Sequence, residues 1–139
     1  MACVAAMLRV PQRIGAQRVF GRTPAPRFCT SSLPVVEKAT SLIKDHGCVI
    51  FSKSTCPFCA LAKTAIQDDL GAKCHVLELD RDLDFKDMDT LQNHFLSTTG
   101  ARSVPRVFIG GKFVGGGSEV SELHSSGQLK GMLEKVGAL

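Results

Sequence analysis

The sequence lacks any long apolar stretch, and it contains no tryptophan. A membrane-spanning helix needs about 18 or more consecutive apolar residues, and no segment of the 139 residues comes near that length. We therefore expect no insertion into a membrane. A composition of 44% hydrophobic and 22% charged residues also excludes a wholly disordered chain and suits one folded domain.

Acidic residues are absent from the first 33 positions, which carry five arginines and no lysine. The rest of the chain has 17 − 5 = 12 basic residues against 13 acidic ones, a net charge of −1. The formal charge of +4 therefore comes from the N-terminal extension and not from the domain. Without a basic surface, nucleic-acid binding loses its electrostatic basis, and we expect no nucleic-acid partner.

The extension has the pattern of a mitochondrial targeting segment. Its arginines recur every four or five residues between apolar side chains. A secretory signal would instead need one compact apolar run, which the arginines interrupt. We predict that residues 1–33 form a disordered mitochondrial transit peptide, cleaved between about Phe28 and Leu33, and that residues 34–139 form the folded domain in the matrix. The alternative is a disordered tail without a targeting function.

Four of the six cysteines fall within the domain: Cys48, Cys56, Cys59 and Cys74. The mitochondrial matrix is reducing, and a domain of this length can bury its own core. We therefore expect no structural disulfide. Cys48 starts a predicted strand and Cys74 precedes another, and both are expected to be inert thiols, with a regulatory role as the lesser alternative.

Apolar periodicity predicts an alternation of helices and strands along the domain. Their order indicates an α/β fold with parallel and antiparallel pairs in one small sheet. An acid-rich loop is expected before the third helix. The predicted elements are helix 34–46, strand 48–51, a helix from 56 to about 71, strand 75–79, helix 85–99, a hairpin over 106–114 and a helical segment over 119–136 that breaks near Gly127.

The strongest chemical signal is the motif Cys56-Pro57-Phe58-Cys59. Cys56 follows a strand and opens a helix, where free N–H groups and the helix dipole stabilise a thiolate over a thiol. The nearby Lys53 adds positive charge. Cys59 lies one helical turn further along the same face, within disulfide reach and more buried. An exposed, activated thiol backed by a second thiol is what thiol–disulfide exchange requires.

The alternative for this motif is half of a zinc site. Zinc would need two further ligands at metal-binding spacing, with about three to five residues between them. His75 and His94 are 94 − 75 = 19 residues apart. The motif, placed between a strand and a helix, therefore favours redox chemistry, and no metal site is expected.

Three motifs together resemble the dithiol glutaredoxins, in particular those of mitochondria: K-S-T-C-P-F-C at 53–59, S-V-P at 103–105 and G-G-G-S-E at 115–119. The resemblance implies a thioredoxin-like fold, with a small four-stranded mixed sheet flanked by helices. It also implies the activity of a glutathione-disulfide oxidoreductase, with glutathione as co-substrate and with glutathionylated or disulfide-containing proteins as partners. Cys56 would attack a disulfide, and the mixed disulfide with glutathione would be resolved by a second glutathione or by Cys59.

The resemblance further implies a binding groove for glutathione. Lys53 and Gln92 would face its glycine carboxylate. The backbone of Val104, held by a cis bond to Pro105, would pair with the cysteinyl unit as an added strand does. The residues by themselves leave the isomer of this bond open, since most X–Pro bonds are trans.

Ser118 and Glu119, at the start of the last helical segment, would hold the γ-glutamyl end of glutathione. Helix-start N–H groups and a nearby acceptor suit a carboxylate and an amine. Three positions depart from the residues usual in the family: Phe58 stands for Tyr, Ser103 for Thr and Glu119 for Asp.

Two related functions are alternatives. A thioredoxin-like reductase would require the motif W-C-G-P-C, and this chain has no tryptophan. A carrier of a [2Fe–2S] cluster would hold the cluster between two subunits through Cys56 and a glutathione thiolate. Glutaredoxins of that kind tend to lack a proline after the first cysteine, so Pro57 disfavours the cluster, and we expect a monomeric enzyme.

Overall fold

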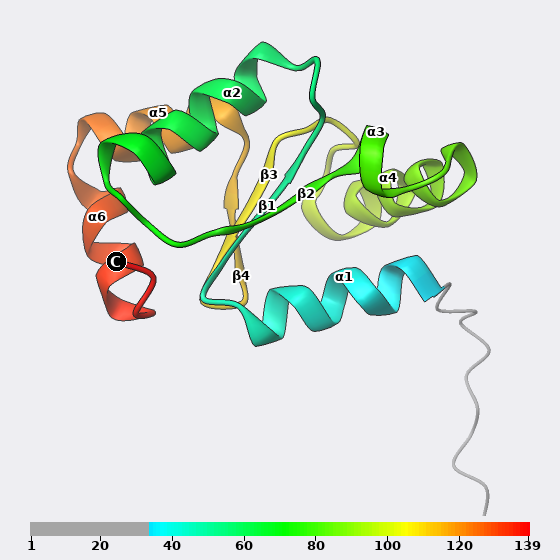
Figure 1. The fold of residues 1–139 in the computed structure, drawn as a ribbon, viewed down its shortest axis with the longest axis horizontal. Helices are drawn as coiled ribbons and strands as arrows, with labels where there is room; N and C mark the ends of the chain where they lie inside the picture. Colours follow the sequence, from blue (N-terminus) through cyan, green and yellow to red (C-terminus); the bar gives the residue numbers. More distant parts are fainter. Residues whose placement is uncertain (1–33) are drawn as a thin grey trace, which may run out of the picture. The chain divides into compact units, whose positions relative to one another are not determined.

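The computed structural model describes residues 34–139 (Figure 1). The predicted transit peptide, residues 1–33, and its cleavage point lie outside this range and stay predictions. Within the described part of the chain, no helix is long and apolar enough to cross a membrane.

A mixed sheet of four strands lies at the centre of the domain. The strands are β1 (Cys48–Ser52), β2 (His75–Glu78), β3 (Arg106–Ile109) and β4 (Lys112–Gly115). β1 pairs in parallel with β2 and antiparallel with β3, and β3 pairs antiparallel with β4, in the order β2-β1-β3-β4. The predicted hairpin and the predicted four-stranded mixed sheet are both confirmed.

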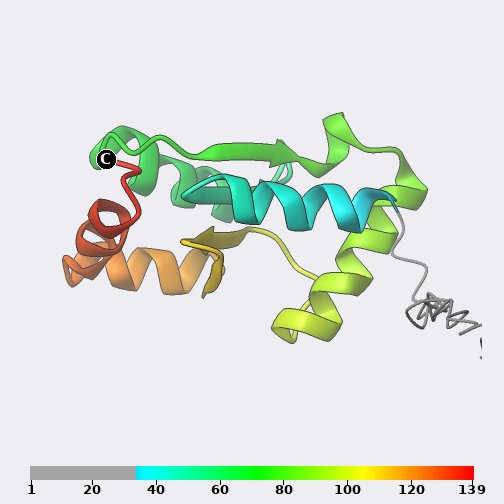
Figure 2. The same ribbon diagram turned by 90° about the horizontal axis from the view of Figure 1, so that it is seen from below.

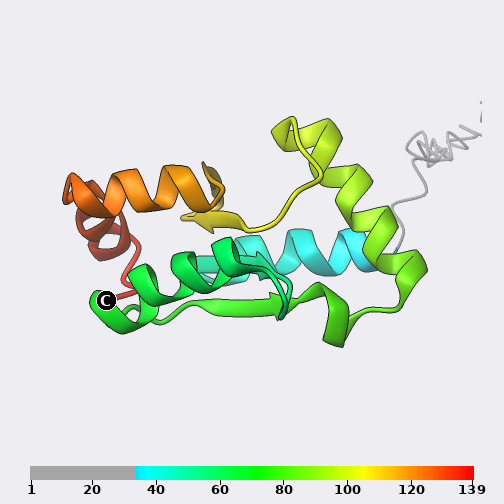
Figure 3. The same ribbon diagram turned by 90° about the horizontal axis from the view of Figure 1, so that it is seen from above.

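Helices cover both faces of the sheet (Figures 1 and 2). They are α1 (Pro34–Asp45), α2 (Pro57–Lys63), its π-helical continuation η1 (Thr64–Asp69), α3 (Leu79–Asp82), α4 (Phe85–Thr99), α5 (Gly117–Ser125) and α6 (Gln128–Lys135). α2, α5 and α6 pack on one face, and α1 and α4 pack on the other. Figure 3 shows α2 and α5 side by side, in agreement with their contacts.

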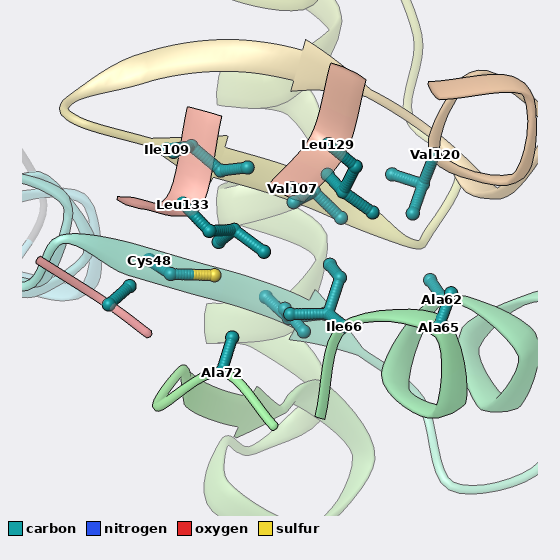
Figure 4. Close-up of a cluster of buried hydrophobic side chains, with 12 residues drawn as sticks. Cys48, Ala62, Ala65, Ile66, Ala72, Val107, Ile109, Val120, Leu129 and Leu133 are labelled. Atoms are coloured by element: carbon teal, nitrogen blue, oxygen red, sulfur yellow. The ribbon is translucent and has the colours of Figure 1, made fainter. Parts of the chain in front are cut away.

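Alternate residues of β1 enter two separate hydrophobic cores. All five residues of the strand are buried, as expected of a central strand covered on both faces. Cys48 and Ile50 belong to the core beneath α2, α5 and α6, which Figure 4 shows. Val49 and Phe51 belong to the core beneath α1 and α4. The two-residue period of a strand therefore directs Ser52, the last residue of β1, toward the α2 face.

The region predicted to be an acid-rich loop contains the short helix α3. The Asp82 carboxylate accepts a hydrogen bond from the Glu78 N–H at 2.8 Å. The Asp84 carboxylate accepts a hydrogen bond from the Asp87 N–H at 2.8 Å, and Asp84 thereby caps the start of α4. The loop prediction was wrong because these carboxylates bind backbone N–H groups at helix starts, which acidic residues do readily.

A disulfide joins Cys48 and Cys74, against the expectation of two inert thiols and no structural disulfide. The parallel register pairs Val49 with His75, so the two residues before them lie side by side. Their Cα atoms are 4.6 Å apart, within the range that a disulfide bridges. The expectation was wrong because it rested on domain size and compartment, whereas strand register decides which sulfur atoms meet.

Candidate active site

Cys56 occupies the position that precedes the first residue of α2. β1 ends at Ser52, and in the loop that follows the Cys56 N–H donates to the Lys53 carbonyl at 3.2 Å. The helix then starts with Pro57, whose fixed φ suits the first helical position. The Ala60 N–H donates to the Cys56 carbonyl at 3.2 Å. The partly exposed Cys56 therefore stands at the positive end of the helix dipole.

Cys59 lies one turn later in α2 and is wholly buried, with 0% exposure. Burial raises the pKa of its thiol to about 11. The Lys53 N–H and the Ser52 hydroxyl oppose this rise in pKa by hydrogen bonding to the thiol, whereas the neighbouring Cys56 adds to it. The predicted contrast is confirmed: both cysteines are free, and Cys59 is the more buried.

The loop before β3 brings a distant segment of the chain to Cys56. The Cys56 sulfur donates to the Val104 carbonyl oxygen at 3.7 Å, across 48 positions in the sequence. The bond between Val104 and Pro105 is cis, as the resemblance implied. The backbone of Val104 thus lies directly beside the reactive sulfur.

A cleft of about 600 Å³ opens beside this contact. Its walls come from α2, the loop before β3, the strand β4 and the start of α5. Four of the predicted glutathione-binding residues line it: Val104, Pro105, Ser118 and Glu119. The structure therefore brings these four together, whereas Lys53 and Gln92 are not part of the lining.

Lys53 and Gln92 lie in the segments that lead to the cleft. Lys53 is half-buried in the loop before Cys56. Gln92 is on α4, and its side-chain amide donates to the Arg102 carbonyl at 3.1 Å. This bond supports the loop that leads to Val104.

Glycines let the start of α5 approach α2 closely. A Cβ atom on Gly117 would lie 3.0 Å from the Phe58 Cβ and 3.2 Å from the Phe58 carbonyl oxygen. A Cβ atom on Gly115 would lie 2.4 Å from the Glu119 Cβ. The Glu119 carboxylate accepts the Gly116 N–H at 3.0 Å. The glycine run and this hydrogen bond together place the first turn of α5 at the cleft.

The sequence analysis missed Arg106, which also lines the cleft. Arg106 is only 6% exposed; burial lowers the pKa of its guanidinium, and the nearby Glu119 opposes that shift. Its Nη2 donates to the Ser103 hydroxyl at 3.2 Å, and its guanidinium carbon lies 5.2 Å from the centre of the Phe113 ring. Its Nε has no hydrogen-bond partner among the described residues. A charged residue within an otherwise apolar strand was the signal that could have revealed it.

The arrangement suits a nucleophilic thiol that reacts beside a polar cleft. The cleft offers a buried cation, the N–H groups of a helix start and an exposed backbone edge to an anionic, peptide-like partner. Within residues 34–139, no group of three or more His, Cys, Asp or Glu side chains is placed to hold a metal ion.

Comparison with known proteins agrees with this chemistry. The family model described as glutaredoxin matches residues 48–114. A glutaredoxin of Vernicia fordii is 41% identical over 102 residues, which cover 73% of this chain and 94% of the relative. Glutaredoxin-C2 of Arabidopsis thaliana is 38% identical over 104 residues, which cover 75% of this chain and 90% of the relative.

Solved structures share the architecture of the domain. The crystal structure of a buckwheat glutaredoxin–glutathione complex matches with a TM-score of 0.69 and 40% identity, covering 76% of this chain and 92% of that one. Oxidized glutaredoxin 2 from Chlamydomonas reinhardtii matches with a TM-score of 0.68 and 37% identity, covering 76% and 95%. The predicted thioredoxin-like fold is thereby confirmed.

Proposed function

Because the chain belongs to the glutaredoxin family, whose members are thiol–disulfide oxidoreductases, we propose that it reduces glutathione mixed disulfides and protein disulfides through Cys56. The observation that carries the proposal is the asymmetry of the two free thiols. Cys56 is partly exposed at a helix start beside the cleft, and Cys59 is buried one turn behind it.

The first step is attack by the Cys56 thiolate on a disulfide. The N–H groups at the start of α2 stabilise the anion that the attack requires. When the substrate is a glutathionylated protein, attack on the glutathione sulfur forms a new S–S bond to Cys56. The electron pair of the broken bond leaves with the protein sulfur as a thiolate.

Glutathione, as co-substrate, then occupies the cleft while it is bonded to Cys56. Its cysteinyl unit pairs with the Val104 backbone, which the bond to Pro105 presents at the edge of the cleft. Its γ-glutamyl carboxylate faces the helix-start N–H groups near Ser118, and its ammonium faces Glu119. The place of these residues in one cleft supports this assignment.

The glycine carboxylate of glutathione is assigned to Lys53 and Gln92. A lysine ammonium and an amide N–H are the donors that a carboxylate accepts. Lys53 lies in the same loop as Cys56, and Gln92 holds the loop that carries Val104. Their approach to the bound tripeptide rests on the family resemblance.

The mixed disulfide is resolved in one of two ways. A second glutathione attacks the glutathione sulfur on Cys56 and regenerates the free thiolate. Alternatively, Cys59 attacks Cys56, forms the Cys56–Cys59 disulfide and releases the bound glutathione. Removal of glutathione from proteins needs only Cys56, whereas reduction of protein disulfides uses both thiols.

The decisive experiment is a steady-state assay with glutathione, glutathione reductase and a low-molecular-weight mixed disulfide. Cys56→Ser should lose the activity, whereas Cys59→Ser should retain deglutathionylation and lose mainly the reduction of protein disulfides. Equal losses in both variants would contradict the assigned roles. The absorbance spectrum after anaerobic purification with glutathione separates the alternative function: a colourless, active monomer supports the enzyme, and visible sulfur-to-iron bands support the [2Fe–2S] carrier.

The extension and the location of the protein belong to the same proposal. Residues 1–33 act as a mitochondrial transit peptide, and residues 34–139 work as a monomeric glutaredoxin domain in the matrix. The acid-free, arginine-spaced sequence supports this assignment. N-terminal sequencing of protein recovered from isolated mitochondria tests it: a start between residues 28 and 33 is expected, and an intact extension on protein found only outside mitochondria would contradict it.

A further inference from the structure

Arg106 is a buried cation that the sheet holds from one side. It is the first residue of β3 and only 6% exposed. Its guanidinium carbon lies 5.2 Å from the centre of the Phe113 ring on β4, a distance at which a cation and an aromatic ring attract each other. The Phe113 ring centre lies 5.4 Å from that of Phe108, which belongs to the core beneath α1 and α4. The guanidinium is therefore anchored, through Phe113, to a packed part of the fold.

The other side of the guanidinium meets the loop before β3. Its Nη2 donates to the Ser103 hydroxyl at 3.2 Å. This hydrogen bond spans the two residues between its partners, Val104 and Pro105, whose peptide bond is cis. The Val104 carbonyl oxygen accepts the hydrogen bond from the Cys56 sulfur. Arg106 thus connects the sheet to the backbone segment that lies beside the reactive thiol.

A charge at this buried position requires an explanation. Among the described residues, no carboxylate lies within ion-pair distance of Arg106, and its Nε has no hydrogen-bond partner. A buried charge with few partners is costly, and an apolar side chain would pack on Phe113 without that cost. What the guanidinium adds is the hydrogen bond to Ser103. The contact with the loop is therefore the property that distinguishes arginine from an apolar residue here.

The loop needs this support because Val104 lies outside the strand. A peptide that adds to an exposed backbone edge binds through N–H and C=O groups, which must stand at hydrogen-bonding distance and angle. Backbone in a loop is more mobile than backbone in a sheet. From α4, the Gln92 amide holds the loop at the Arg102 carbonyl. Arg106 holds it at Ser103, the residue next to Val104, so one contact comes from a helix and the other from the sheet.

We propose that Arg106 is a positioning residue for glutathione: through Ser103 it holds the Val104 backbone where the cysteinyl unit pairs with it. This inference rests on the proposed function. The role is separate from the positive charge that Arg106 brings to the cleft. It depends on the Ser103 hydroxyl, whereas the charge does not, and this difference makes it testable.

Single-turnover reactions with two disulfides test this role. Glutathione disulfide uses the cleft, whereas dipyridyl disulfide has no peptide groups to pair with the loop. All proteins are the full chain in which serine replaces every cysteine except Cys56 and the bonded Cys48–Cys74 pair. The rate constant for glutathione disulfide is measured by intact mass after acid quenching, and that for dipyridyl disulfide by the absorbance of the released pyridinethione.

The variants are Arg106→Gln, Ser103→Ala, these two combined, and Ser103→Thr. The control is Ser97→Ala, because the exposed Ser97 hydroxyl donates within α4 to the His94 carbonyl.

The expected result is a loss confined to glutathione disulfide. Arg106→Gln and Ser103→Ala should each slow this reaction about five- to tenfold, the range of a single hydrogen bond, and leave the reaction with dipyridyl disulfide within about twofold of the wild type. The double variant should be no slower than Arg106→Gln alone, because the hydroxyl has no effect once its donor is gone. Ser103→Thr, which keeps the hydroxyl, should retain the wild-type rate, and Ser97→Ala should match it.

Two results would overturn the positioning role. A wild-type rate with glutathione disulfide in Ser103→Ala would show that Arg106 does not act through this hydroxyl. Equal slowing with both disulfides would show a general effect on the fold or on the Cys56 thiolate. Ser103→Ala, at an exposed position, keeps the test valid where Arg106→Gln fails to fold. Failure of the wild-type sequence at these positions to form any mixed disulfide on Cys56 would instead refute the proposed function.

Discussion

The two cysteine pairs of the domain lie at opposite ends of β1, and only one of them is bonded. Cys48 and Cys74 form a disulfide across β1 and β2, whereas Cys56 and Cys59 are free. The adjacent strands β1 and β2 hold the side chains of Cys48 and Cys74 opposite each other, and their sulfur atoms are bonded. One turn of helix places two thiols within reach of each other, and there they stay separate.

The two pairs differ in solvent exposure, and this difference decides which pair can react with glutathione and which pair supports the fold. Cys48 is 0% exposed and Cys74 is half-buried, so glutathione has little access to their bond. Cys56 is partly exposed beside the cleft. The disulfide spans 26 positions and encloses the whole segment that carries both active-site thiols. We therefore interpret Cys48–Cys74 as the structural pair and Cys56–Cys59 as the reactive pair.

The largest expected effect separates the two pairs by activity. Cys56→Ser should remove measurable turnover in the glutathione-linked assay, because among residues 34–139 the other free thiol, Cys59, is buried. Cys74→Ser should keep most of the activity at a temperature where the variant is folded. Comparable losses of activity in the two variants would end the distinction between a reactive and a structural pair.

The second prediction concerns stability, where substitution in the structural pair should have the larger effect. A disulfide that closes a segment of 26 positions stabilises the fold by about 3 kcal/mol through the entropy of the unfolded chain. Cys74→Ser should lower the free energy of unfolding by about that amount in urea titrations without reductant. Cys59→Ser, measured alongside, should not lose this contribution. Equal stability of Cys74→Ser and wild type would show that the bond does not form in solution.

The third prediction is a loss of stability at alkaline pH that belongs to the reactive pair alone. The pKa of Cys59 is raised to about 11 from an ordinary value near 9.0, so the unfolded chain releases this proton first as pH rises. The contribution is fully present below about pH 9 and is lost as pH rises through about 11, an effect of about 3 kcal/mol.

Urea titrations between pH 8 and pH 11 measure this loss on protein in which the Cys48–Cys74 disulfide is intact and Cys56 and Cys59 are free thiols. Cys59→Ser should show a flatter decline than the wild type over that range, since it has no thiol to ionise. Parallel declines would mean that burial does not hold the Cys59 proton.

The smallest expected effect concerns Lys53, which we assign to the glycine carboxylate of glutathione. Lys53→Gln should raise the KM for glutathione about three- to fivefold, the range of a single exposed ion pair, with the unfolding free energy unchanged. Lys130→Gln on α6, where the lysine is 63% exposed, is the matched control. An unchanged KM in Lys53→Gln would remove this residue from the glutathione-binding set.

Much of the fold could be predicted from the sequence because the local signals agree with one another. α4 spans Phe85–Thr99, as its apolar spacing indicated, and the hairpin turns at Gly110 and Gly111 as expected. The short helix α3 was missed because it consists of four mostly polar residues, and the hydrogen bond from the Glu78 N–H to Asp82 has no periodic signature.

The part of the candidate site that could be predicted is the C-P-F-C motif, because its residues are close together in the chain and lie at a helix start. Cys56, Pro57 and Cys59 could be placed on a helix start from their spacing alone. Arg106 carried only the weaker signal of a charge within an apolar strand, because its contact with the Phe113 ring and its place in the cleft exist only in the folded domain.

The sequence by itself determined the helix start at the C-P-F-C motif, the alternation of helices and strands, and the separation of a basic extension from a near-neutral domain. These properties depend on residues close together in the chain. Only the tertiary structure decided that Cys48 meets Cys74, that Val104 lies against Cys56, and that the Ser52 hydroxyl donates to Glu78. Each of these contacts joins segments whose distance is set by strand register and helix packing, and a local pattern of residues does not contain that information.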